Sequence, residues 1–310
     1  MAICSRSFSA NPILRNEILK KYRNVTFNDS GEKLVGERLV EFLRGHQKTI
    51  IGLETIDGDL LDRVPQLRVI SKYGVGLDTV DLNSMSERGV RLGWTPGVNS
   101  RSVAELVLAV TIALLRNLSE LVPEVRDGGW RQPVGRCLSG KTVGIIGWGA
   151  VGRDLALLLV PFSCEILVND IQEIDTTGLP PDFEVSNIED LLCRADVVTL
   201  HIPLGPTTVG FLGRERMSLM KDTAILINTS RGGVVDEGCL ASMLSEGLIA
   251  GASCDVFEEE PPTGSELLQL PNFLPTPHIG GSTEESYILM GRAAILGLDD
   301  NKIPSIIANV

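Results

Sequence analysis

The chain has 310 residues, a hydrophobic content of 43% and a formal net charge of -12. Its length and apolar content suffice for two hydrophobic cores, so two domains are expected. The acidic balance repels phosphate backbones and anionic lipid, which excludes nucleic acid and membrane surfaces as expected partners and leaves a small molecule. The longest apolar run, Leu106 to Leu115, is too short to span a bilayer, so a cytoplasmic location is predicted.

The six cysteines form no CxxC pair, and several of them stand inside apolar runs. This usage is typical of reduced, buried thiols rather than of disulfides or metal ligands. No metal site is therefore predicted.

The first half of the chain alternates short apolar runs with helical patterns from Lys48 onward. Such alternation is typical of βαβ units around a parallel sheet. A longer helical pattern, Ser100 to Asn117, follows and ends this half. Strands are predicted at Thr49 to Leu53, Arg68 to Ser71 and Val90 to Leu92, with a helical segment at Asp81 to Arg88.

The second half repeats the alternation more regularly and predicts a six-strand, doubly wound sheet. The tail from Thr283 to Gly297 predicts a helix that is too short to form a domain of its own. We expect it to pack back on the first domain, which makes that domain discontinuous in sequence. The predicted strands are Thr142 to Ile146, Glu165 to Asn169, Asp196 to Leu200, Ala224 to Asn228, Ile249 to Ser253 and Asn272 to Leu274.

A glycine-rich turn in the pattern GxGxxG, made by Gly147, Gly149 and Gly152, stands between the first of these strands and a helical stretch. The first glycine allows a tight turn, the second lets a pyrophosphate approach the backbone, and the third lets helix and strand pack closely. The N-terminus of the helix attracts phosphate charge. In this setting the turn predicts a dinucleotide site that includes Ala150 and Val151.

Asp170 indicates which dinucleotide is bound. It closes the next strand about twenty residues after the turn, where an acid can take the ribose diol of the adenosine. A carboxylate there repels a 2'-phosphate, and the following residues 171–173 supply no cation to accept one. NAD is therefore predicted rather than NADP.

Hydride transfer at a hydroxyl carbon needs an acid/base, a group that holds it in the right charge state, and a cation for a carboxylate. The second half offers one such set in His278, Glu260 and Arg231, each of which follows a predicted strand. Because the carboxyl ends of parallel strands share one edge of the sheet, distant residues can meet there.

These residues stand in motifs that resemble the D-isomer-specific 2-hydroxyacid dehydrogenases, and within them the D-3-phosphoglycerate dehydrogenase branch. The resemblance covers nearly the whole chain. It implies an α/β fold with two doubly wound parallel-sheet domains, a Rossmann NAD-binding domain (99–283) inserted in a smaller, flavodoxin-like substrate domain (1–98 plus 284–310). The motifs are Ser71 to Asp78, Thr95 to Asn99, Ser102 to Glu105, the glycine turn, His201 to Pro203, Asn228 to Glu237, Asp255 to Pro262 and Pro277 to Thr283.

The resemblance implies a catalytic role for each of three residues. His278 is the expected acid in reduction and the base in oxidation. Glu260 is expected to hydrogen-bond His278 and to favour its protonated form. Arg231, with its planar fork of donors, is expected to bind the substrate carboxylate and to polarise the C2 oxygen.

The resemblance also implies two sets of binding residues. Asp255 matches the family residue at the nicotinamide carboxamide, and His201 is expected to be a neighbour of the cofactor rather than an acid/base. The remaining predicted cofactor contacts are Ile202, Pro203, Thr207, Thr229, Ser230, Arg231, His278, Gly280 and Gly281. The predicted substrate contacts are Lys72, Tyr73, Gly74, Val75, Gly76, Asn99, Arg231 and His278.

The identity of the substrate stays open at this point. Lys72 occupies the place where phosphoglycerate enzymes of the family commonly carry an arginine that meets the phosphate, so a 3-phosphoglycerate-like substrate is favoured. Against it, Tyr73 replaces a small residue, Ala150 replaces an arginine common in the turn, and a short form without the C-terminal regulatory domain is expected. Glyoxylate, hydroxypyruvate or a phosphonate-bearing acid fits the same machinery.

Two further expectations come from the resemblance. A homodimer is expected, through the region Ser100 to Asn117. The alternative function, of a different class, is an NAD-sensing corepressor or scaffold, which does not need the acid/base that His278 provides.

Overall fold

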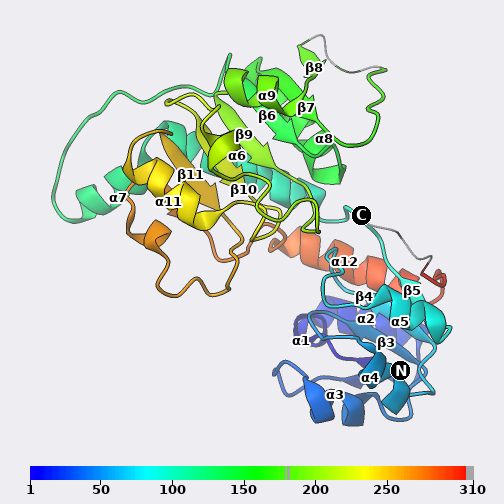
Figure 1. Ribbon diagram of the computed structural model, residues 1–310. Helices are drawn as coiled ribbons and strands as arrows, with labels where there is room; N and C mark the ends of the chain where they lie inside the picture. Colours follow the sequence, from blue (N-terminus) through cyan, green and yellow to red (C-terminus); the bar gives the residue numbers. More distant parts are fainter. Residues whose placement is uncertain (178, 180–181, 305–310) are drawn as a thin grey trace. The chain divides into compact units, whose positions relative to one another are not determined.

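The computed structural model describes residues 1–177, 179 and 182–304, and the chain divides into two compact units (Figure 1). Unit 1 comprises Met1–Asn99 and Ser282–Val310, and unit 2 comprises Ser100–Gly281. Each unit contains a sheet of its own whose strands pair in parallel. The predicted fold class, α/β with two parallel sheets, is therefore confirmed.

The sheet of unit 1 has five strands in the order β2-β1-β3-β4-β5. This is the flavodoxin-like order, in which the chain reverses its direction of growth between β1 and β3. Sequence patterning missed β1 and β2 because each is only two residues long, which is too short to show an apolar pattern. The strands are β1 Ala2–Ile3, β2 Thr26–Phe27, β3 Lys48–Ile51, β4 Val69–Lys72 and β5 Arg91–Gly93.

Most helices of unit 1 begin at polar caps, and α3, which follows Val35, is the exception. Asn11, Asp57, Asp81 and Thr283 each accept a hydrogen bond from a backbone N–H in the first turn of the helix that follows. These bonds satisfy donors that the start of a helix leaves without a partner. The helices are α1 Arg6–Ala10, α2 Pro12–Lys21, α3 Gly36–Leu43, α4 Gly58–Arg63, α5 Leu82–Glu87 and α12 Glu284–Gly297.

The last helix, α12, returns to the sheet of unit 1. Its Met290 and Ala294 are buried in one core cluster with Phe8 and Tyr73. The helix crosses β5 so closely that a Cβ added to Gly93 would lie 2.1 Å from the carbonyl oxygen of Gly297. A glycine at this position therefore permits the packing of α12 on β5.

The sheet of unit 2 has seven strands in the order β12-β11-β10-β9-β6-β7-β8. The predicted count of six was wrong, because β8 is a three-residue edge strand with two exposed residues and leaves no apolar pattern. The strands are β6 Thr142–Ile146, β7 Glu165–Asn169, β8 Phe183–Val185, β9 Val197–Leu200, β10 Ile225–Asn228, β11 Gly251–Cys254 and β12 Phe273–Pro275.

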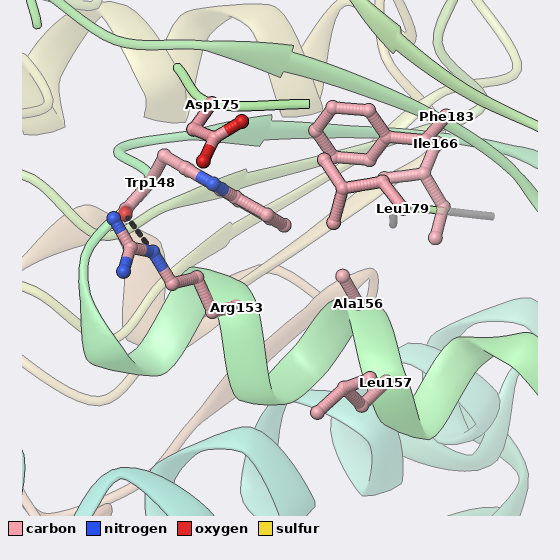
Figure 2. A pocket seen from close by; sticks show the side chains of 8 residues that line it. All are labelled: Trp148, Arg153, Ala156, Leu157, Ile166, Asp175, Leu179 and Phe183. Carbon is pink, nitrogen blue, oxygen red and sulfur yellow. Dashed lines mark hydrogen bonds between the residues drawn. The ribbon is translucent and has the colours of Figure 1, made fainter. Parts of the chain in front are cut away.

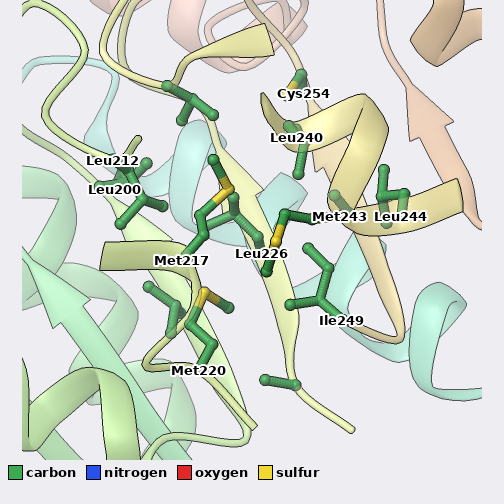
Figure 3. Close-up of a cluster of buried hydrophobic side chains, with 14 of the residues drawn as sticks. Leu200, Leu212, Met217, Met220, Leu226, Leu240, Met243, Leu244, Ile249 and Cys254 are labelled. Atoms are coloured by element: carbon green, nitrogen blue, oxygen red, sulfur yellow. The ribbon is translucent and has the colours of Figure 1, made fainter. Parts of the chain in front are cut away.

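Both faces of this sheet are buried. On β10, Leu226 belongs to one core cluster, while Ile225 and Ile227 belong to a second. Successive side chains of a strand point to opposite faces, so the two clusters lie on the two sides of the sheet. Figure 3 shows the first cluster, in which Leu226 of β10 lies among Met217, Met243 and other apolar side chains.

The helices of unit 2 include the long apolar helix α6, most of whose buried apolar side chains belong to the second cluster. Within the described ranges of the chain, no single helix is long and apolar enough to cross a membrane; α6 and α7 meet the requirement only as a pair, bent by 68°. The helices are α6 Ser100–Leu115, α7 Leu118–Arg126, α8 Ala150–Leu159, η1 Val160–Phe162, α9 Ile188–Arg194, α10 Arg214–Met217, α11 Glu237–Ser245 and η2 Glu266–Gln269.

Candidate active site

Three neighbouring strands of unit 2 deliver the three predicted catalytic residues to one edge of the sheet. Arg231 follows β10, Glu260 follows β11 and His278 follows β12, and these strands are adjacent and parallel. The pairing continues past the strand ends, because the N–H of Asp255 donates to the carbonyl of Asn228 at 2.9 Å and that of Thr276 to Cys254 at 3.0 Å. The loops therefore leave the same carboxyl edge, where open α/β sheets bind their ligands.

His278 and Glu260 are in direct contact. The distance between Nδ1 of His278 and Oε2 of Glu260 is 2.8 Å, and the two side chains are 53% and 39% exposed. A histidine with Nδ1–H on a carboxylate presents Nε2 to its surroundings, and Nε2 accepts a proton when the ring is neutral and donates one when the ring is protonated. The pair thus has the geometry of an acid/base held in place by a carboxylate.

Asp255 fixes the loop that carries His278. Its side chain is 2% exposed. Oδ1 accepts from the hydroxyl of Thr276 at 2.6 Å and the N–H of Ile279 at 2.8 Å, and Oδ2 accepts from the N–H of Gly280 at 2.7 Å. His278 lies between these anchors with a φ of 54°, in the left-handed region that non-glycine residues rarely adopt.

Asn228 holds the turn that carries Arg231 in a similar way, through hydrogen bonds of its side chain. Its Oδ1 accepts from both the N–H and the hydroxyl of Ser230, at 3.0 and 2.7 Å, and its Nδ2 donates to the carbonyl of Arg231 at 2.9 Å. The guanidinium donates to the carbonyl of Ser230 at 2.7 Å. Asn228 is 1% exposed, so this turn is held from within the protein.

The turn of Arg231 packs tightly on the loop of Glu260. A Cβ added to Gly232 would lie 1.9 Å from the carbonyl oxygen of Phe257, so only glycine fits there. The N–H of Phe257 in turn donates to Oε1 of Glu260 at 3.2 Å. The turn of Arg231 is thus linked to the loop of Glu260 through close backbone packing, and Glu260 is linked to His278 through its side chain.

The glycine turn has the shape that a dinucleotide needs. Gly147 has a φ of 102°, and a Cβ added to Gly152 would lie 2.3 Å from the carbonyl oxygen of Gly147, so both positions require glycine. A Cβ added to Gly149 would instead enter open space. Gly149 also caps α8 without a side-chain hydrogen bond, which leaves the first-turn N–H groups, including those of Ala150 and Val151, for a pyrophosphate.

Asp170 lies against this turn. Its Oδ2 accepts from the N–H of Trp148 at 2.6 Å, and its Oδ1 accepts from the N–H of Gln172 at 2.8 Å. A carboxylate has about four acceptor sites, so these two bonds leave capacity for the hydroxyls of a ribose. Asp170 can therefore shape the turn and receive a ribose at the same time.

The side chain of Trp148 points away from the turn and into a pocket at the outer part of the sheet (Figure 2). Its ring lies 4.9 Å from that of Phe183. The pocket has a volume of about 270 Å³ and a mostly apolar lining that includes none of the predicted site residues. Trp148 therefore anchors the glycine turn to β8 rather than contributing to the catalytic edge.

The segment after β9 lies over the glycine turn. A Cβ added to Gly147 would meet the carbonyl oxygen of His201 at 2.6 Å and Cγ2 of Ile202 at 3.0 Å. Nε2 of His201 is 3.1 Å from the hydroxyl of Thr199, and burial lowers the pKa of His201 to about 3. A histidine that stays neutral at physiological pH positions its neighbours and cannot supply a proton there.

The other predicted cofactor contacts differ in exposure. Pro203 and Thr207 are exposed, and Gly281 is partly exposed. Thr229 has a buried hydroxyl oxygen with no hydrogen-bond partner in the described part of the chain. An unsatisfied buried hydroxyl costs free energy until a ligand supplies a partner, so Thr229 fits a polar contact to the cofactor. The glycine turn, Asp170 and Thr229 together fit NAD.

The predicted substrate contacts of unit 1 follow β4. Nζ of the buried Lys72 donates to the carbonyl of Gly52, and the ring of Tyr73 packs edge-on against Phe8 inside the core. Trp94 donates its indole N–H to the carbonyl of Val75 at 2.9 Å. Gly74, Gly76 and Asn99 are partly exposed.

Sequence patterns did not single out three residues that act through the backbone of others. Asn228 holds the Arg231 turn, Ser102 donates its hydroxyl to the carbonyl of Gly280 at 2.6 Å, and Glu54 accepts the N–H of Gly52 at 2.5 Å. Asn228 did carry a signal, because it is a polar residue at the end of an otherwise apolar strand.

Comparison with known proteins agrees with this geometry. Residues 108–280 match the family model of the D-isomer specific 2-hydroxyacid dehydrogenase, NAD binding domain. A glyoxylate reductase of Thermofilum pendens is 38% identical over 253 residues, which cover 79% of this chain and 75% of that protein.

Two further proteins extend the comparison. A D-3-phosphoglycerate dehydrogenase of Methanocaldococcus jannaschii is 35% identical over 88% of this chain, which spans 53% of the length of that relative. The structure of D-lactate dehydrogenase from Aquifex aeolicus with NAD and lactic acid superposes with a TM-score of 0.83 at 25% identity, covering 96% and 93% of the two chains. The chain therefore belongs to the D-isomer specific 2-hydroxyacid dehydrogenase family, and it is an NAD-dependent dehydrogenase.

Proposed function

We propose that this enzyme reduces a small 2-keto acid to the D-2-hydroxy acid, reversibly, with His278 as the acid/base. The observation that carries the proposal is the 2.8 Å contact between His278 and Glu260 on a loop that Asp255 holds in place. A structural histidine needs neither a carboxylate partner nor a left-handed backbone, whereas a positioned proton donor needs both orientation and charge stabilisation.

In the direction of reduction, bound NADH supplies a hydride to C2 of the keto acid. Nε2 of His278 gives its proton to the C2 oxygen, so the carbonyl becomes a hydroxyl. Glu260 stabilises the protonated imidazole before the transfer and orients the ring. Arg231 binds the substrate carboxylate through its planar fork and polarises the C2 carbonyl, because its positive charge stabilises negative charge on the C2 oxygen. In oxidation each transfer runs backwards.

The cofactor is held by four groups of residues in this proposal. The N–H groups at Gly149 to Gly152 take the pyrophosphate, and Asp170 takes the adenosine ribose. His201 to Pro203, with Thr207, form the wall above the glycine turn. The side that receives the nicotinamide is formed by Thr229 to Arg231, Asp255 and His278 to Gly281.

A screen of 2-keto acids with NADH tests the proposal. We expect NADH oxidation with at least one of glyoxylate, hydroxypyruvate and 3-phosphohydroxypyruvate. His278→Ala is expected to lower kcat by several orders of magnitude while the variant still binds NADH, since the glycine turn that takes the pyrophosphate lies elsewhere in unit 2. His46→Ala, a change of a histidine in unit 1, is the matched control and should keep full activity.

Two results would contradict the proposal. Full turnover by His278→Ala would remove the acid/base role. Tight NADH binding without turnover of any acid would instead favour an NAD-sensing scaffold.

A further inference from the structure

A carboxylate from another element, that of Glu237, holds the loop that carries Glu260. Glu237 is the first residue of α11 and is partly buried. Its Oε1 accepts the N–H of Glu258 at 2.6 Å. The proposed chemistry gives this side chain no task, although its partner precedes Glu260 by only two residues. The bond therefore fixes the backbone from which the side chain of Glu260 extends.

The position of Glu237 is itself fixed by the start of α11. Asp236 caps the helix by accepting the N–H of Cys239 at 2.8 Å, and Leu240 and Leu244 bury the helix in the core of unit 2. A side chain on a capped and packed helix is held more precisely than one on a loop. An acid in the first turn also stabilises a helix through its dipole, so the residue type alone does not decide the role of Glu237.

Two successive N–H groups of the loop bind two different carboxylates. The N–H of Phe257 donates to Oε1 of Glu260 at 3.2 Å, and the N–H of Glu258 donates to Oε1 of Glu237. Glu260 uses its other oxygen, Oε2, for Nδ1 of His278 at 2.8 Å. The orientation of the Glu260 carboxylate thus depends on where the N–H of Phe257 lies, and Glu237 holds the residue next to it.

The bond to Glu237 forms where the loop leaves the core. Phe257 is 6% exposed, and its ring lies 6.3 Å from that of Phe273. The next three residues, 258–260, are all exposed. Packing therefore holds the loop as far as Phe257, and the hydrogen bond to Glu237 extends this support by one residue toward Glu260.

The charges around Glu237 make its position unfavourable without this bond. Burial raises the pKa of Glu237, and the charges of Glu258 and Glu260 raise it further, while the N–H of Glu258 stabilises the charged form. A partly buried carboxylate among like charges costs free energy unless a hydrogen bond compensates it. The N–H of Glu258 supplies this compensation, so the helix and the loop stabilise each other at this contact.

We propose that Glu237 is a positioning residue of the acid/base: by holding the N–H of Glu258 it fixes the loop of Glu260, and with it the contact between Glu260 and His278. This inference rests on the proposed function and adds a residue to its machinery. Every contact that carries it lies within unit 2.

Two substitutions of similar size test the hydrogen bond. Glu237→Met cannot accept the N–H of Glu258, so we expect kcat of keto acid reduction to fall about 10-fold, since a small displacement of a catalytic group is costly. The KM of the keto acid and the NADH affinity should stay as in the wild type. Glu237→Gln keeps an accepting oxygen and should recover most of the loss. Glu215→Met, at an exposed position of α10, is the control.

The pH profile separates positioning from a purely structural role. Reduction needs a protonated His278, so kcat falls as pH rises. A misplaced Glu260 stabilises the protonated ring less, so the fall in Glu237→Met should come at a pH lower by about half a unit or more. Glu237→Gln should keep the profile of the wild type. Hydrogen exchange of the Glu258 amide should become faster in Glu237→Met and stay slow in Glu237→Gln.

Two results would overturn the inference. A lower Tm for Glu237→Met with the kcat and pH profile of the wild type would make Glu237 a stabiliser of α11 only. Equal shifts of the profile in Glu237→Gln and Glu237→Met would place the effect in the charge of Glu237 rather than in its hydrogen bond.

The proposed function fails in a different way. Full turnover by His278→Ala would remove the acid/base and the inference with it, even where amide exchange shows that Glu237 holds Glu258. A wild-type profile in Glu237→Met, beside an inactive His278→Ala, would contradict the inference alone.

Discussion

Asp255 shows how a single buried carboxylate can hold the loop of His278, the proposed acid/base. The resemblance to the family implied a contact with the nicotinamide carboxamide. The structure adds three hydrogen bonds to the loop on both sides of His278, all shorter than 2.9 Å. These bonds offset the strain of the left-handed backbone at His278.

We predict that Asp255→Asn lowers kcat about 10- to 100-fold, because an amide nitrogen cannot accept the backbone N–H that one carboxylate oxygen now accepts. NADH titration separates the two roles of this residue. A loss confined to kcat indicates positioning of His278, and a weaker NADH affinity indicates a contact with the cofactor. Asp222→Asn, at an exposed position of unit 2, is the control. Unchanged kcat and affinity would exclude both roles.

The buried His201 is expected to lower the stability of the folded protein as the pH falls. Burial lowers its pKa to about 3 in the folded state, whereas the unfolded chain takes up this proton near pH 6.5. Between these two values the unfolded state binds more protons, so the free energy of unfolding falls as pH falls, by about 1 kcal/mol per pH unit.

We therefore predict that His201→Gln flattens the dependence of stability on pH. Urea unfolding at pH 7 and at pH 5 should show a larger loss for the wild type than for the variant, by about 2 kcal/mol. Identical losses would mean that His201 titrates normally in the folded protein.

At the scale of elements, the glycines of the glycine turn are needed for different reasons, although they look alike in the sequence. Packing requires a glycine at position 152, because a Cβ added to Gly152 would meet the carbonyl of Gly147. A Cβ added to Gly149 would face open space. The same substitution should therefore damage the fold at one position and the ligand site at the other.

We predict that Gly149→Ala keeps the Tm of the wild type but weakens NADH binding at least about 10-fold, because the new methyl group enters the space of the pyrophosphate. Gly152→Ala should instead lower Tm, since overpacking of a tight contact costs about 1 to 3 kcal/mol. Calorimetry and fluorescence titration on the two variants check this. Equal NADH affinity in Gly149→Ala and the wild type would place the pyrophosphate elsewhere.

Strands that are buried on both faces were the elements most accurately predicted from sequence. Thr142–Ile146 and Glu165–Asn169 have the predicted bounds because each is an apolar run ended by a turn. The strand predicted at Thr49 to Leu53 is instead Lys48–Ile51. It ends at Ile51, and the side chains of Glu54 and Lys72 take the polar groups of the next residue, Gly52; such contacts leave no trace in local patterning.

Local sequence patterns also revealed only part of the candidate site. Arg231, Glu260 and His278 could be found from sequence because each follows a strand within a distinctive motif. Asn228 showed only as a polar residue at the end of an apolar strand, and Glu54 gave no signal, because both act by holding the backbone of other residues. Their roles become visible only when the partners are placed in three dimensions.

At the scale of the whole molecule, each of the apolar core clusters lies within one of the two units. The clusters around Leu226 and Ile225 lie within unit 2, and those around Ile70 and Tyr73 lie within unit 1. Each unit therefore has the buried apolar surface that a domain needs.

A homodimer was expected through Ser100 to Asn117, but most of the apolar side chains of α6 are buried inside unit 2. The exposed apolar residues lie in the part of the chain that follows α6. Helix α7 has no buried residue, and the segment after it carries Trp130 and Val134, which are 77% and 96% exposed. Large apolar side chains exposed together are typical of a surface that another chain covers.

We predict that a second copy of this chain covers α7 and the segment after it. Sedimentation velocity should show a dimer for the wild type and a monomer for the variant Trp130→Ser/Val134→Glu. Leu248→Glu, at another exposed apolar residue of unit 2, should stay dimeric. A monomeric wild type at micromolar concentration would contradict the prediction.

The central claim is that the residues at the carboxyl edge of unit 2 direct a hydride to C2 of a keto acid while His278 supplies the proton. The most direct test uses hydroxypyruvate and NADH that carries deuterium at the transferred position of C4. We predict D-glycerate with one deuterium at C2, formed by the wild type and not by His278→Ala. Product without deuterium at C2, or the L-isomer, would contradict the account.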